Sequence, residues 1–592
     1  MELVPGIRIA IQTVLAEKFN YRINTQDILV NETKPEFTGD YTVVLFSFSK
    51  ILKTNPDILG RGLGEALIVS KPEWFADFNV IKGFLNLVLA DAVLLDFLHH
   101  HYKDSSYGLQ SPNGKCVMIE YSSPNTNKPL HLGHLRNNFL GWSVAALYKA
   151  CGFEIVKTCI ANDRGIHICK SMVAWQKFAS GATPETTGIK GDHFVGDYYV
   201  LFGNELKKQA EAGMAGGLSK DIAEKEAPIM RSAQQMLISW EAGDPAVMEL
   251  WRKMNNWVYA GFDITYKRIG SDFDKIYYES QTYLLGKNLV EMGLTKKVFF
   301  QKEDGSVWID LKSDGLDEKI VQRSDGTAVY MTQDIGLAVE KYEEYHADLS
   351  IYVVADEQNY HFKVLKLICQ KLQLPSAAGI YHLSYGLVEL PSGRMKTREG
   401  NVVDADDIID EMTDIAAKHT EDLGKVSDFT ADERAKLYDT IGLGALKFFL
   451  LRVDPKKRMV FNPDESIDFH GFTGPFVQYA HARIKSILRK ESIEEYPDKE
   501  FKALLPLEKE LLINLEKYSL LLQQACAEMN PSLLANYVFN IAKIFNSFYS
   551  EHSVSRAESE NKKQLRLRIC VMTANVIQSS MNLLGIKVPE RM

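Results

Sequence analysis

The sequence predicts a multidomain α/β plus α fold whose central domain contains a doubly wound parallel sheet. A compact apolar run at 116–121 is followed by a Pro- and Asn-rich loop, an amphipathic helix at about 131–151 and a second strand at 154–160. Strand, loop, helix and strand in this order open a Rossmann-like domain. Beyond about residue 405 the apolar spacing is helical to the end, which predicts an all-α C-terminal bundle.

The remaining patterns divide the chain into several expected domains, because its 592 residues exceed what one hydrophobic core usually supports. Helical spacing at 7–19 and 56–69 alternates with short strands at 41–48 and 84–89, which predicts an α+β N-terminal domain. Further strands are expected at 297–311, 328–331 and 349–355. The expected domains are 1–110, 111–404 with a helical insertion at about 170–265, a helical stem at 405–460 and a helical bundle at 461–592.

The composition argues against several classes of protein. The net charge of −9 and the pI near 5.9 argue against a non-specific nucleic-acid binder, without excluding an enzyme that gathers its basic residues on one face. The seven cysteines are scattered and include no C-x-x-C pair, so neither a disulfide framework nor a zinc site is expected. No apolar run reaches the roughly 18 residues of a membrane span. We therefore expect a soluble, cytoplasmic chain with no membrane contact.

The most informative segment is Glu120–His134, which joins a predicted strand to the long helix. Free backbone N–H groups and the helix dipole favour a phosphate at such a place. His131 and His134 are three residues apart, so they share a helix face and could both donate hydrogen bonds to phosphate oxygens. Gly133 leaves room for a base close to the backbone, and Lys128 adds a cation. The alternative is two ordinary histidines at a helix start that follows a loop.

This segment resembles the HIGH signature of class I aminoacyl-tRNA synthetases. The preceding S-P-N-x-x-K-P is similar to the arginyl-tRNA synthetase version in particular. Further segments resemble the same family in the expected order: Glu279-Ser280-Gln281, 323–334, 355–362, 474–483 and the final Pro589-Glu590-Arg591-Met592. The resemblance therefore covers nearly the whole chain.

The resemblance implies a pocket for arginine. A guanidinium is planar and permanently charged, so carboxylates and other hydrogen-bond acceptors hold it best. By resemblance, Glu279 and Asp334 hold the guanidinium with Tyr330 beside it, and a helix beginning at Tyr330 would put Tyr330 and Asp334 on one face. The alternatives are a helix cap or surface charge for Asp334 and a core aromatic for Tyr330. The other expected arginine-binding residues are Asn125 and Gln358, at the α-amino and carboxylate end, and Glu120, at the pocket floor.

The resemblance also implies an ATP site with a second, basic loop. The K-M-S-K-S loop of the class appears here as Arg394-Met395-Lys396-Thr397-Arg398, with threonine in place of the second lysine. Its basic side chains still supply positive charge for phosphoryl chemistry, and a solvated basic loop is the alternative. The expected ATP-binding residues are His131, Gly133, His134, His361, Arg394, Met395 and Lys396. The expected catalytic residues are His131, His134, Lys128, Lys396 and Arg398, acting on ATP with Mg²⁺ and without a protein-bound structural metal.

Two places are expected to contact tRNA. Tyr479 and Arg483, four residues apart in the C-terminal helices, could stack on and pair with unstacked bases, and the resemblance adds Met592. Phe84 and Asn86 fall where the extra N-terminal domain of the family contacts the tRNA elbow. The alternatives are a solvated helix face for the first pair and core packing for Phe84.

The activity that the resemblance implies is that of an arginyl-tRNA synthetase. Such an enzyme activates L-arginine with ATP to arginyl-adenylate and transfers it to the terminal adenosine of tRNA(Arg), and we expect a monomer. One alternative is another class I synthetase, for example for cysteine, against which the Glu279 and Asp334 pair counts. The other is a tRNA-binding paralogue that has lost activation, supported only by the altered loop at 394–398.

Overall fold

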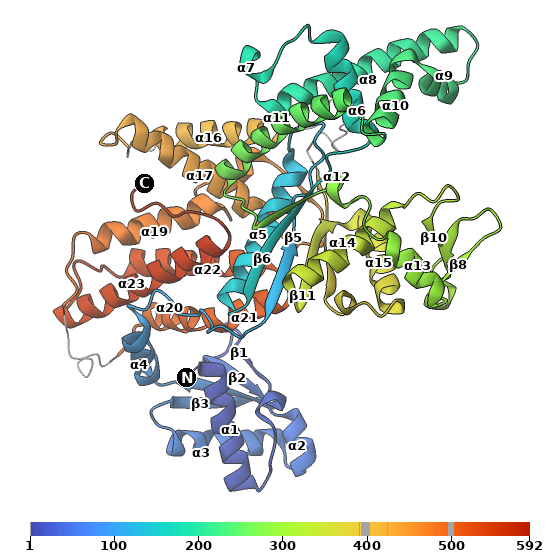
Figure 1. The fold of residues 1–592 in the computed structure, drawn as a ribbon. Helices are drawn as coiled ribbons and strands as arrows, with labels where there is room; N and C mark the ends of the chain where they lie inside the picture. The colour runs from blue at the N-terminus through green and yellow to red at the C-terminus, as the bar shows by residue number, and fades with distance from the viewer. Residues whose placement is uncertain (1, 390, 392–402, 423, 425, 495–502) are drawn as a thin grey trace.

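The computed structural model describes residues 2–592 except 390, 392–402, 423, 425 and 495–502. An N-terminal unit lies at the bottom of Figure 1, and the helices that lead to the C-terminus lie on the left. The helices of the insertion extend across the top, and a small three-stranded sheet lies at the right. These groups of elements surround one central parallel sheet.

The N-terminal unit combines an antiparallel sheet with helices, which confirms the predicted α+β class. Its elements are α1 (Leu3–Phe19), η1 (Thr25–Asp27), β1 (Val30–Glu32), β2 (Tyr41–Val44), α2 (Phe46–Leu52), α3 (Pro56–Ser70), β3 (Phe75–Ile81), β4 (Phe84–Leu89) and α4 (Asp91–His101). The strands lie in the order β1-β2-β4-β3. The single strand predicted at 41–48 is wrong in its second half, where α2 begins and buries Phe48 in the core.

The central sheet is entirely parallel, as predicted for a doubly wound domain. Its elements are β5 (Cys116–Glu120), α5 (Leu132–Ala150), β6 (Glu154–Ala161), β7 (Lys275–Tyr278), β11 (Leu349–Ala355), η3 (Asp356–Gln358), α15 (Asn359–Lys371), η4 (Pro375–Ala377) and β12 (Ile380–Tyr385). The strand order is β12-β11-β5-β6-β7. The chain moves outward from β5 first to one side and later to the other, so the order reverses between β5 and β11.

The predicted helical insertion lies between β6 and β7. It consists of α6 (Ile166–Phe178), α7 (Pro184–Thr187), α8 (Gly191–Ala215), α9 (Lys220–Glu226), α10 (Pro228–Glu241) and α11 (Pro245–Ile269). Its two longest helices, α8 and α11, pack against each other (Figure 1). Both ends of the insertion therefore return to the central sheet.

The segment between β7 and β11 differs from the sequence prediction. It contains α12 (Glu279–Thr282), α13 (Lys287–Thr295), β8 (Phe299–Gln301), β9 (Val307–Ile309), η2 (Lys312–Asp314), β10 (Lys319–Gln322) and α14 (Tyr330–Tyr345). The strand predicted at 297–311 is two antiparallel strands, because a turn with Gly305 at φ 85° divides it. The strand predicted at 328–331 is wrong: Ala328 makes one isolated bridge to Gln322, and α14 begins at Tyr330.

The C-terminal part is helical, as predicted. Its elements are α16 (Ala405–Asp422), α17 (Ala431–Leu451), α18 (Pro463–Ile467), α19 (Gly474–Leu488), α20 (Pro506–Glu516), α21 (Tyr518–Ala527), α22 (Pro531–Glu551) and α23 (Glu560–Leu583), with the short parallel pair β13 (Val388–Glu389) and β14 (Met459–Val460). Helix α5 contacts α17, α21 and α22 as well as the sheet. One hydrophobic core therefore extends from the sheet into the bundle.

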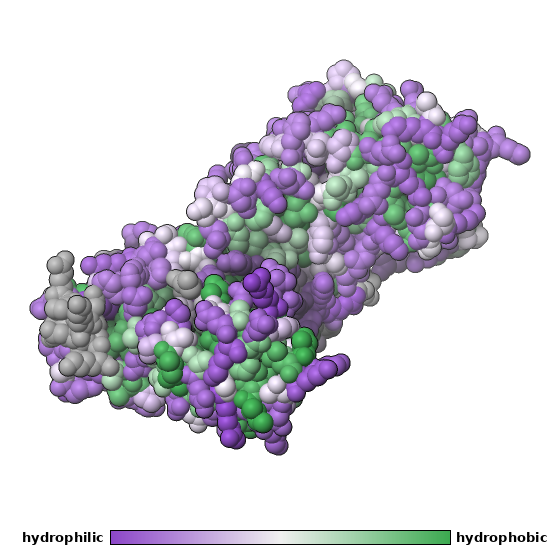
Figure 2. Space-filling model, turned by 90° about the horizontal axis from the view of Figure 1, so that it is seen from below, coloured by the Kyte–Doolittle hydropathy of each residue, from purple (hydrophilic) through white to green (hydrophobic). Residues whose placement is uncertain are grey.

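The surface is predominantly polar on the face drawn in Figure 2, where small hydrophobic groups are scattered among hydrophilic residues. Among the described residues, no helix combines the length and the apolar character needed to cross a membrane.

Candidate active site

A cavity of about 400 Å³ lies where the strand order reverses, at the carboxyl ends of β5 and β11. Open α/β sheets bind ligands at this point. The turn that leaves β5 carries two consecutive serines in the left-handed region, Ser122 at φ 82° and Ser123 at φ 47°. Non-glycine residues in this conformation store strain on the order of 1–3 kcal/mol each and cluster at ligand sites. A strained turn and the start of α5 therefore shape the cavity.

Two histidines at the N-terminus of α5 line this cavity. The Gly133 backbone N–H donates to His131 Nδ1 at 3.1 Å, and the His131 backbone N–H donates to His134 Nδ1 at 3.1 Å. Because Nδ1 accepts in both rings, each neutral ring carries its proton on Nε2. Burial lowers the pKa of His131 to about 3 and holds the pKa of His134 well below its usual value. Both histidines are therefore neutral hydrogen-bond donors.

A buried amide behind the histidines ties the turn to the sheet. Asn137 Oδ1 accepts from the Ser122 backbone N–H at 2.5 Å, and Asn137 Nδ2 donates to the Val353 carbonyl at 2.7 Å. The same Nδ2 lies 3.2 Å from the Tyr385 hydroxyl. The sequence motifs did not indicate Asn137 or Tyr385. The available signal was the Asn137-Asn138 pair in the long helix, because a buried amide must find hydrogen-bond partners.

The two carboxylates expected to bind a guanidinium lie on neighbouring helices. Glu279 begins α12 directly after β7, and Asp334 lies in α14, which contacts α12. Because α14 begins at Tyr330, Tyr330 and Asp334 share a helix face as predicted, and Tyr330 is 72% exposed. Burial raises the pKa of Glu279 to about 7, opposed by Arg164 and reinforced by Asp163 and Asp334. The two carboxylates are therefore within electrostatic reach of each other.

Asp334 also contacts a histidine of the next helix. His361 Nε2, on α15, lies 2.6 Å from Asp334 Oδ2. The family resemblance implies that His361 lies at the ATP site and Asp334 at the arginine site, so this pair joins the two expected sites. A guanidinium that binds Asp334 would therefore meet a carboxylate whose Oδ2 already contacts His361.

Asp163, which the sequence motifs did not indicate, anchors the start of α12. Its side chain is buried and accepts from the Ser280 backbone N–H at 2.8 Å, the Ser280 hydroxyl at 2.7 Å and the Tyr259 hydroxyl at 2.8 Å. These bonds fix Ser280 and thereby the adjacent Glu279. The available signal was an aspartate shortly after the predicted strand at 154–160, at the ligand-binding edge of the sheet.

The other expected arginine-binding residues lie in three different settings. Glu120, at the end of β5, is buried and its carboxylate accepts from Lys341 Nζ of α14, which is also buried. Asn125 and Gln358 follow β5 and β11 and are exposed at the same edge of the sheet. Direct arginine binding by Asn125 and Gln358 stays a prediction, whereas Glu120 is already neutralised by a buried lysine.

The expected ATP site is described only in part. Arg394, Met395, Lys396 and Arg398 lie outside the described residues, so their roles stay predictions. Lys128 is half-buried, and burial lowers its pKa.

The described part of the cavity has features that a nucleotide site requires. Its volume is typical of small-molecule sites, and donor groups converge on it at a helix N-terminus. Glu357 is the acidic residue among those that line it. A Mg²⁺ ion here would therefore depend mainly on nucleotide phosphates and water for its ligands.

The C-terminal residues expected to contact tRNA form an aromatic and cationic group. The Arg483 guanidinium lies 4.8 Å from the Tyr479 ring centre and 5.2 Å from that of Tyr549. Arg483 Nη1 also donates to Asn546 Oδ1 at 2.5 Å. Met592 packs half-buried against the core. Planar groups of this kind can stack on bases, but contact with RNA stays a prediction.

The two N-terminal residues expected to contact tRNA are placed differently from each other. Phe84 is 38% exposed and meets Phe46 edge-on, with ring centres 5.3 Å apart. Asn86 is 2% exposed; its Nδ2 donates to Asn79 Oδ1 at 2.7 Å and its Oδ1 accepts from the Thr42 hydroxyl at 2.6 Å. Phe84 is therefore accessible to a partner, whereas the Asn86 amide is engaged within the sheet.

The chain matches two family models over most of its length and known proteins over all of it. A family model described as the catalytic domain of class I (R) tRNA synthetases matches residues 98–462, and the DALR anticodon binding domain matches residues 477–592. The arginine–tRNA ligase of Flavobacterium psychrophilum is 51% identical, with 100% of both chains covered. That of Parabacteroides distasonis is 50% identical, with 98% of both chains covered.

Solved structures share the fold. The arginyl-tRNA synthetase of Thermus thermophilus has a TM-score of 0.78 at 23% identity, with 99% of both chains covered. The arginyl-tRNA synthetase of Plasmodium falciparum has a TM-score of 0.76 at 19% identity, with 100% of both chains covered.

Proposed function

The chain belongs to the class I arginyl-tRNA synthetases, and from that premise we propose that it joins L-arginine to tRNA(Arg) at the expense of ATP. The observation that carries this proposal is the 51% identity to an arginine–tRNA ligase over the whole chain. The geometry supports it, because the carboxylates of Glu279 and Asp334 lie near the same sheet edge as the cavity with its two histidines.

The proposed reaction has two steps. In the first, the arginine carboxylate attacks the α-phosphorus of ATP, giving arginyl-adenylate and releasing pyrophosphate. In the second, the 2′-hydroxyl of the terminal adenosine of tRNA attacks the arginyl carbonyl, and AMP leaves. His131 and His134 would donate from Nε2 to phosphate oxygens as negative charge builds there. The other contribution of the protein is to hold the reacting atoms in place.

The guanidinium of arginine is proposed to bind between Glu279 and Asp334, beside Tyr330. A bound cation offsets the repulsion between two neighbouring carboxylates, so this pair favours a cationic side chain. The raised pKa of Glu279, about 7, reflects burial of a charge that the substrate would neutralise. Lysine carries the same charge but lacks the planar fork that two carboxylates can bind together.

The partners follow from this reaction. We propose that ATP arrives with Mg²⁺, that tRNA(Arg) contacts Tyr479, Arg483 and Met592, and that the enzyme acts as a monomer in the cytoplasm. The cysteines are free thiols, which suits a reducing compartment. Sedimentation velocity of the free enzyme tests the monomer, because a dimer would sediment as a species of twice the 66.9 kDa chain mass.

The proposed function is tested by ATP–pyrophosphate exchange with each of the twenty amino acids, with and without bulk tRNA. We expect exchange with arginine alone. The family resemblance also implies that arginine activation waits for bound tRNA, so we expect exchange only when tRNA is present. Exchange with another amino acid would keep the class I fold but contradict the proposed pocket. Binding of ATP and tRNA with no exchange would instead indicate the tRNA-binding paralogue.

A further inference from the structure

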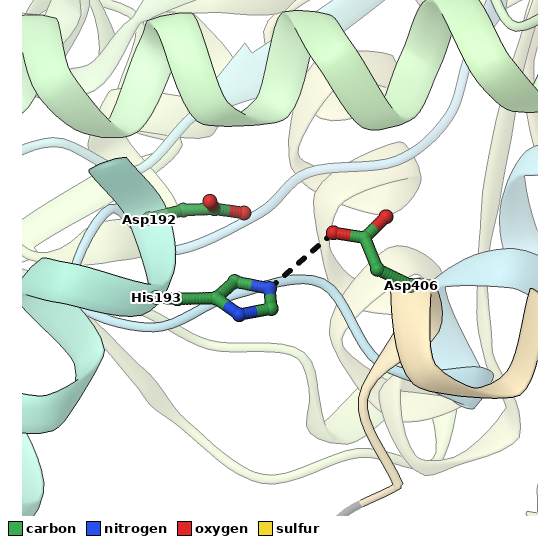
Figure 3. A group of neighbouring side chains, drawn as sticks. All are labelled: Asp192, His193 and Asp406. Atoms are coloured by element: carbon green, nitrogen blue, oxygen red, sulfur yellow. Dashed lines mark ion pairs between the residues drawn. The ribbon is translucent and has the colours of Figure 1, made fainter. Parts of the chain in front are cut away.

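Four charged side chains join the insertion to the start of α16. Lys190 immediately precedes α8 and His193 lies in its first turn, whereas Asp404 immediately precedes α16 and Asp406 is its second residue. Figure 3 shows His193 directed toward Asp406, with Asp192 beside them. We call Lys190, His193, Asp404 and Asp406 the latch. None of these residues belongs to the segments that carry the family resemblance.

The contacts within the latch are short and shielded from solvent. Lys190 Nζ lies 2.5 Å from Asp406 Oδ2, and His193 Nε2 lies 3.3 Å from a carboxylate oxygen of both Asp404 and Asp406. Lys190 Nζ also donates to the Thr265 hydroxyl at 2.7 Å, and that hydroxyl donates to Asp406 Oδ1 at 3.0 Å. The side chains of the latch are 15–30% exposed. Because Thr265 belongs to α11, the latch gathers both long helices of the insertion.

The same residues could suggest a metal site, since Asp192, His193 and Asp406 place ligand atoms within 4.8 Å of one another. However, Lys190 Nζ already lies 3.0 Å from Asp192 Oδ2 and 2.5 Å from Asp406 Oδ2. A divalent ion at this place would compete with an ammonium group for the same carboxylate oxygens. The charge pattern therefore favours intramolecular ion pairs over a metal site.

The latch is connected to the cavity through the backbone. Asp404 and His131 form an antiparallel bridge; the Leu132 N–H donates to the Val403 carbonyl at 3.2 Å, and the Ala405 N–H donates to the Leu130 carbonyl at 3.0 Å. The segment that carries Asp404 is thus paired with the segment that carries the first histidine of the cavity. A displacement at Asp404 would be transmitted directly to His131.

Helix α8 makes a second contact with the segment before His131. A Cβ at Gly196 would lie 2.8 Å from Pro129 Cδ, so the helix and the proline are already in close contact. The insertion therefore reaches the cavity segment both through Pro129 and through the latch. Only the latch depends on charge, which makes its contribution separable by substitution.

We propose that Lys190, His193, Asp404 and Asp406 are positioning residues for arginine activation: by fixing the strand-like segment at 403–405 to the insertion, they hold His131 in its place at the cavity. This inference rests on the proposed function. It assigns the base of the insertion a role in the first chemical step. The four residues would act through the position of His131 and not through contact with a substrate. Small misplacement of a group that stabilises a transition state lowers the rate of the chemical step strongly.

The test compares Asp406→Asn, His193→Gln and the double variant in tRNA-dependent ATP–pyrophosphate exchange. Asp407→Asn is the matched control, because Asp407 lies on the same turn of α16 but is exposed. We expect each latch variant to lower kcat about tenfold, while KM for arginine and Kd for tRNA stay within about twofold. The kcat of the double variant should be no lower than that of the less active single variant, because both substitutions break the same contact.

Three outcomes would overturn the positioning role. The first is wild-type kcat in Asp406→Asn. The second is a double variant whose loss is the product of the single losses, which would make the two residues independent. The third is a parallel fall in kcat, tRNA affinity and thermal unfolding midpoint, the mark of general damage to the fold. If the wild-type chain itself shows no arginine-dependent exchange, the proposed function fails and the positioning role falls with it.

Discussion

At the scale of single residues, Asp334 is the group on which arginine selection should depend most. The substitution Asp334→Ala removes a carboxylate that is 38% exposed and faces His361. We expect kcat/KM for arginine to fall about 10²-fold or more, since loss of one member of a charged pair costs roughly 3 kcal/mol. Binding of ATP and tRNA, measured by calorimetry and filter binding, should stay within about twofold. Glu343→Ala, an exposed position on the same helix, is the control.

An equal loss of tRNA affinity in Asp334→Ala would show that the residue has been misplaced. So would unchanged use of arginine, in which case Glu279 alone would account for the guanidinium site. Asp334→Ala also removes the partner of His361. Unchanged use of arginine would therefore show that neither Asp334 nor its contact with His361 matters for arginine binding.

Residue patterns predicted the histidines at the start of α5 and the shared face of Tyr330 and Asp334, because both are local relations along one helix. The pattern did not predict the contact between Asp334 and His361, since it depends on how α14 and α15 pack. Asp163 was missed for the same reason: its partners come from α11 and α12. Local spacing identifies groups on one element, whereas contacts between elements need the fold.

At the scale of secondary-structure elements, the buried pair of Glu120 and Lys341 joins β5 to α14. Their side chains are 9% and 1% exposed. We expect Lys341→Met to destabilise the enzyme by about 3–5 kcal/mol, because it leaves the Glu120 carboxylate buried without a partner. The double variant Glu120→Gln with Lys341→Met should recover most of that loss. Thermal unfolding midpoints measure both effects.

The exposed pair of Lys275 and Glu344, 2.9 Å apart, provides the control for this prediction. Lys275→Met should leave the unfolding midpoint nearly unchanged, because solvent screens an exposed ion pair. The double variant at Glu120 and Lys341 should also keep its KM for arginine within about threefold, as expected if Glu120 supports the pocket floor without touching the substrate. A large rise in that KM would instead assign Glu120 to direct binding.

Among the strands of the central sheet, those with continuous apolar runs were predicted and the two edge strands were not. The central strands β5 and β11 are continuous apolar runs and were predicted, as expected for strands buried on both faces. The edge strands β7 and β12 were missed, because their exposed positions interrupt the apolar pattern. A strand was predicted at the start of α14, where the structure has a single bridge at Ala328 and then a helix.

At the scale of the whole molecule, the order of the parts was predicted from changes in apolar spacing, but their contacts were not. The expected boundaries at 110, 404 and 460 remain proposals, and the family models cover 98–462 and 477–592 instead. Boundaries are difficult to predict here because α5 packs against both the sheet and the bundle. A helix shared by the sheet and the bundle places both in one hydrophobic core, so apolar spacing alone does not show where one unit ends.

The contact between the N-terminal unit and the bundle should depend on pH through Glu516. Its buried carboxylate accepts from the Leu3 backbone N–H of α1 at 2.5 Å, and burial raises the pKa of Glu516 from 4.5 to about 7. Between pH 4.5 and about 7, the Glu516 carboxyl group is therefore protonated in the folded chain and ionised in the unfolded chain. This stabilisation is complete below pH 4.5 and is lost as the pH rises through 7, by up to roughly 3 kcal/mol.

The substitution Glu516→Gln should remove this dependence, because the amide is neutral at every pH and its oxygen can still accept from Leu3. We expect its unfolding midpoint to exceed that of the wild type at pH 8 and to match it near pH 5, as measured by scanning fluorimetry. Glu510→Gln, an exposed position on α20, should follow the wild type at both values. If Glu516→Gln is less stable than the wild type at pH 8, the Glu516 carboxylate is charged and stabilised by its partners. The contact between the two units then does not depend on protonation of Glu516.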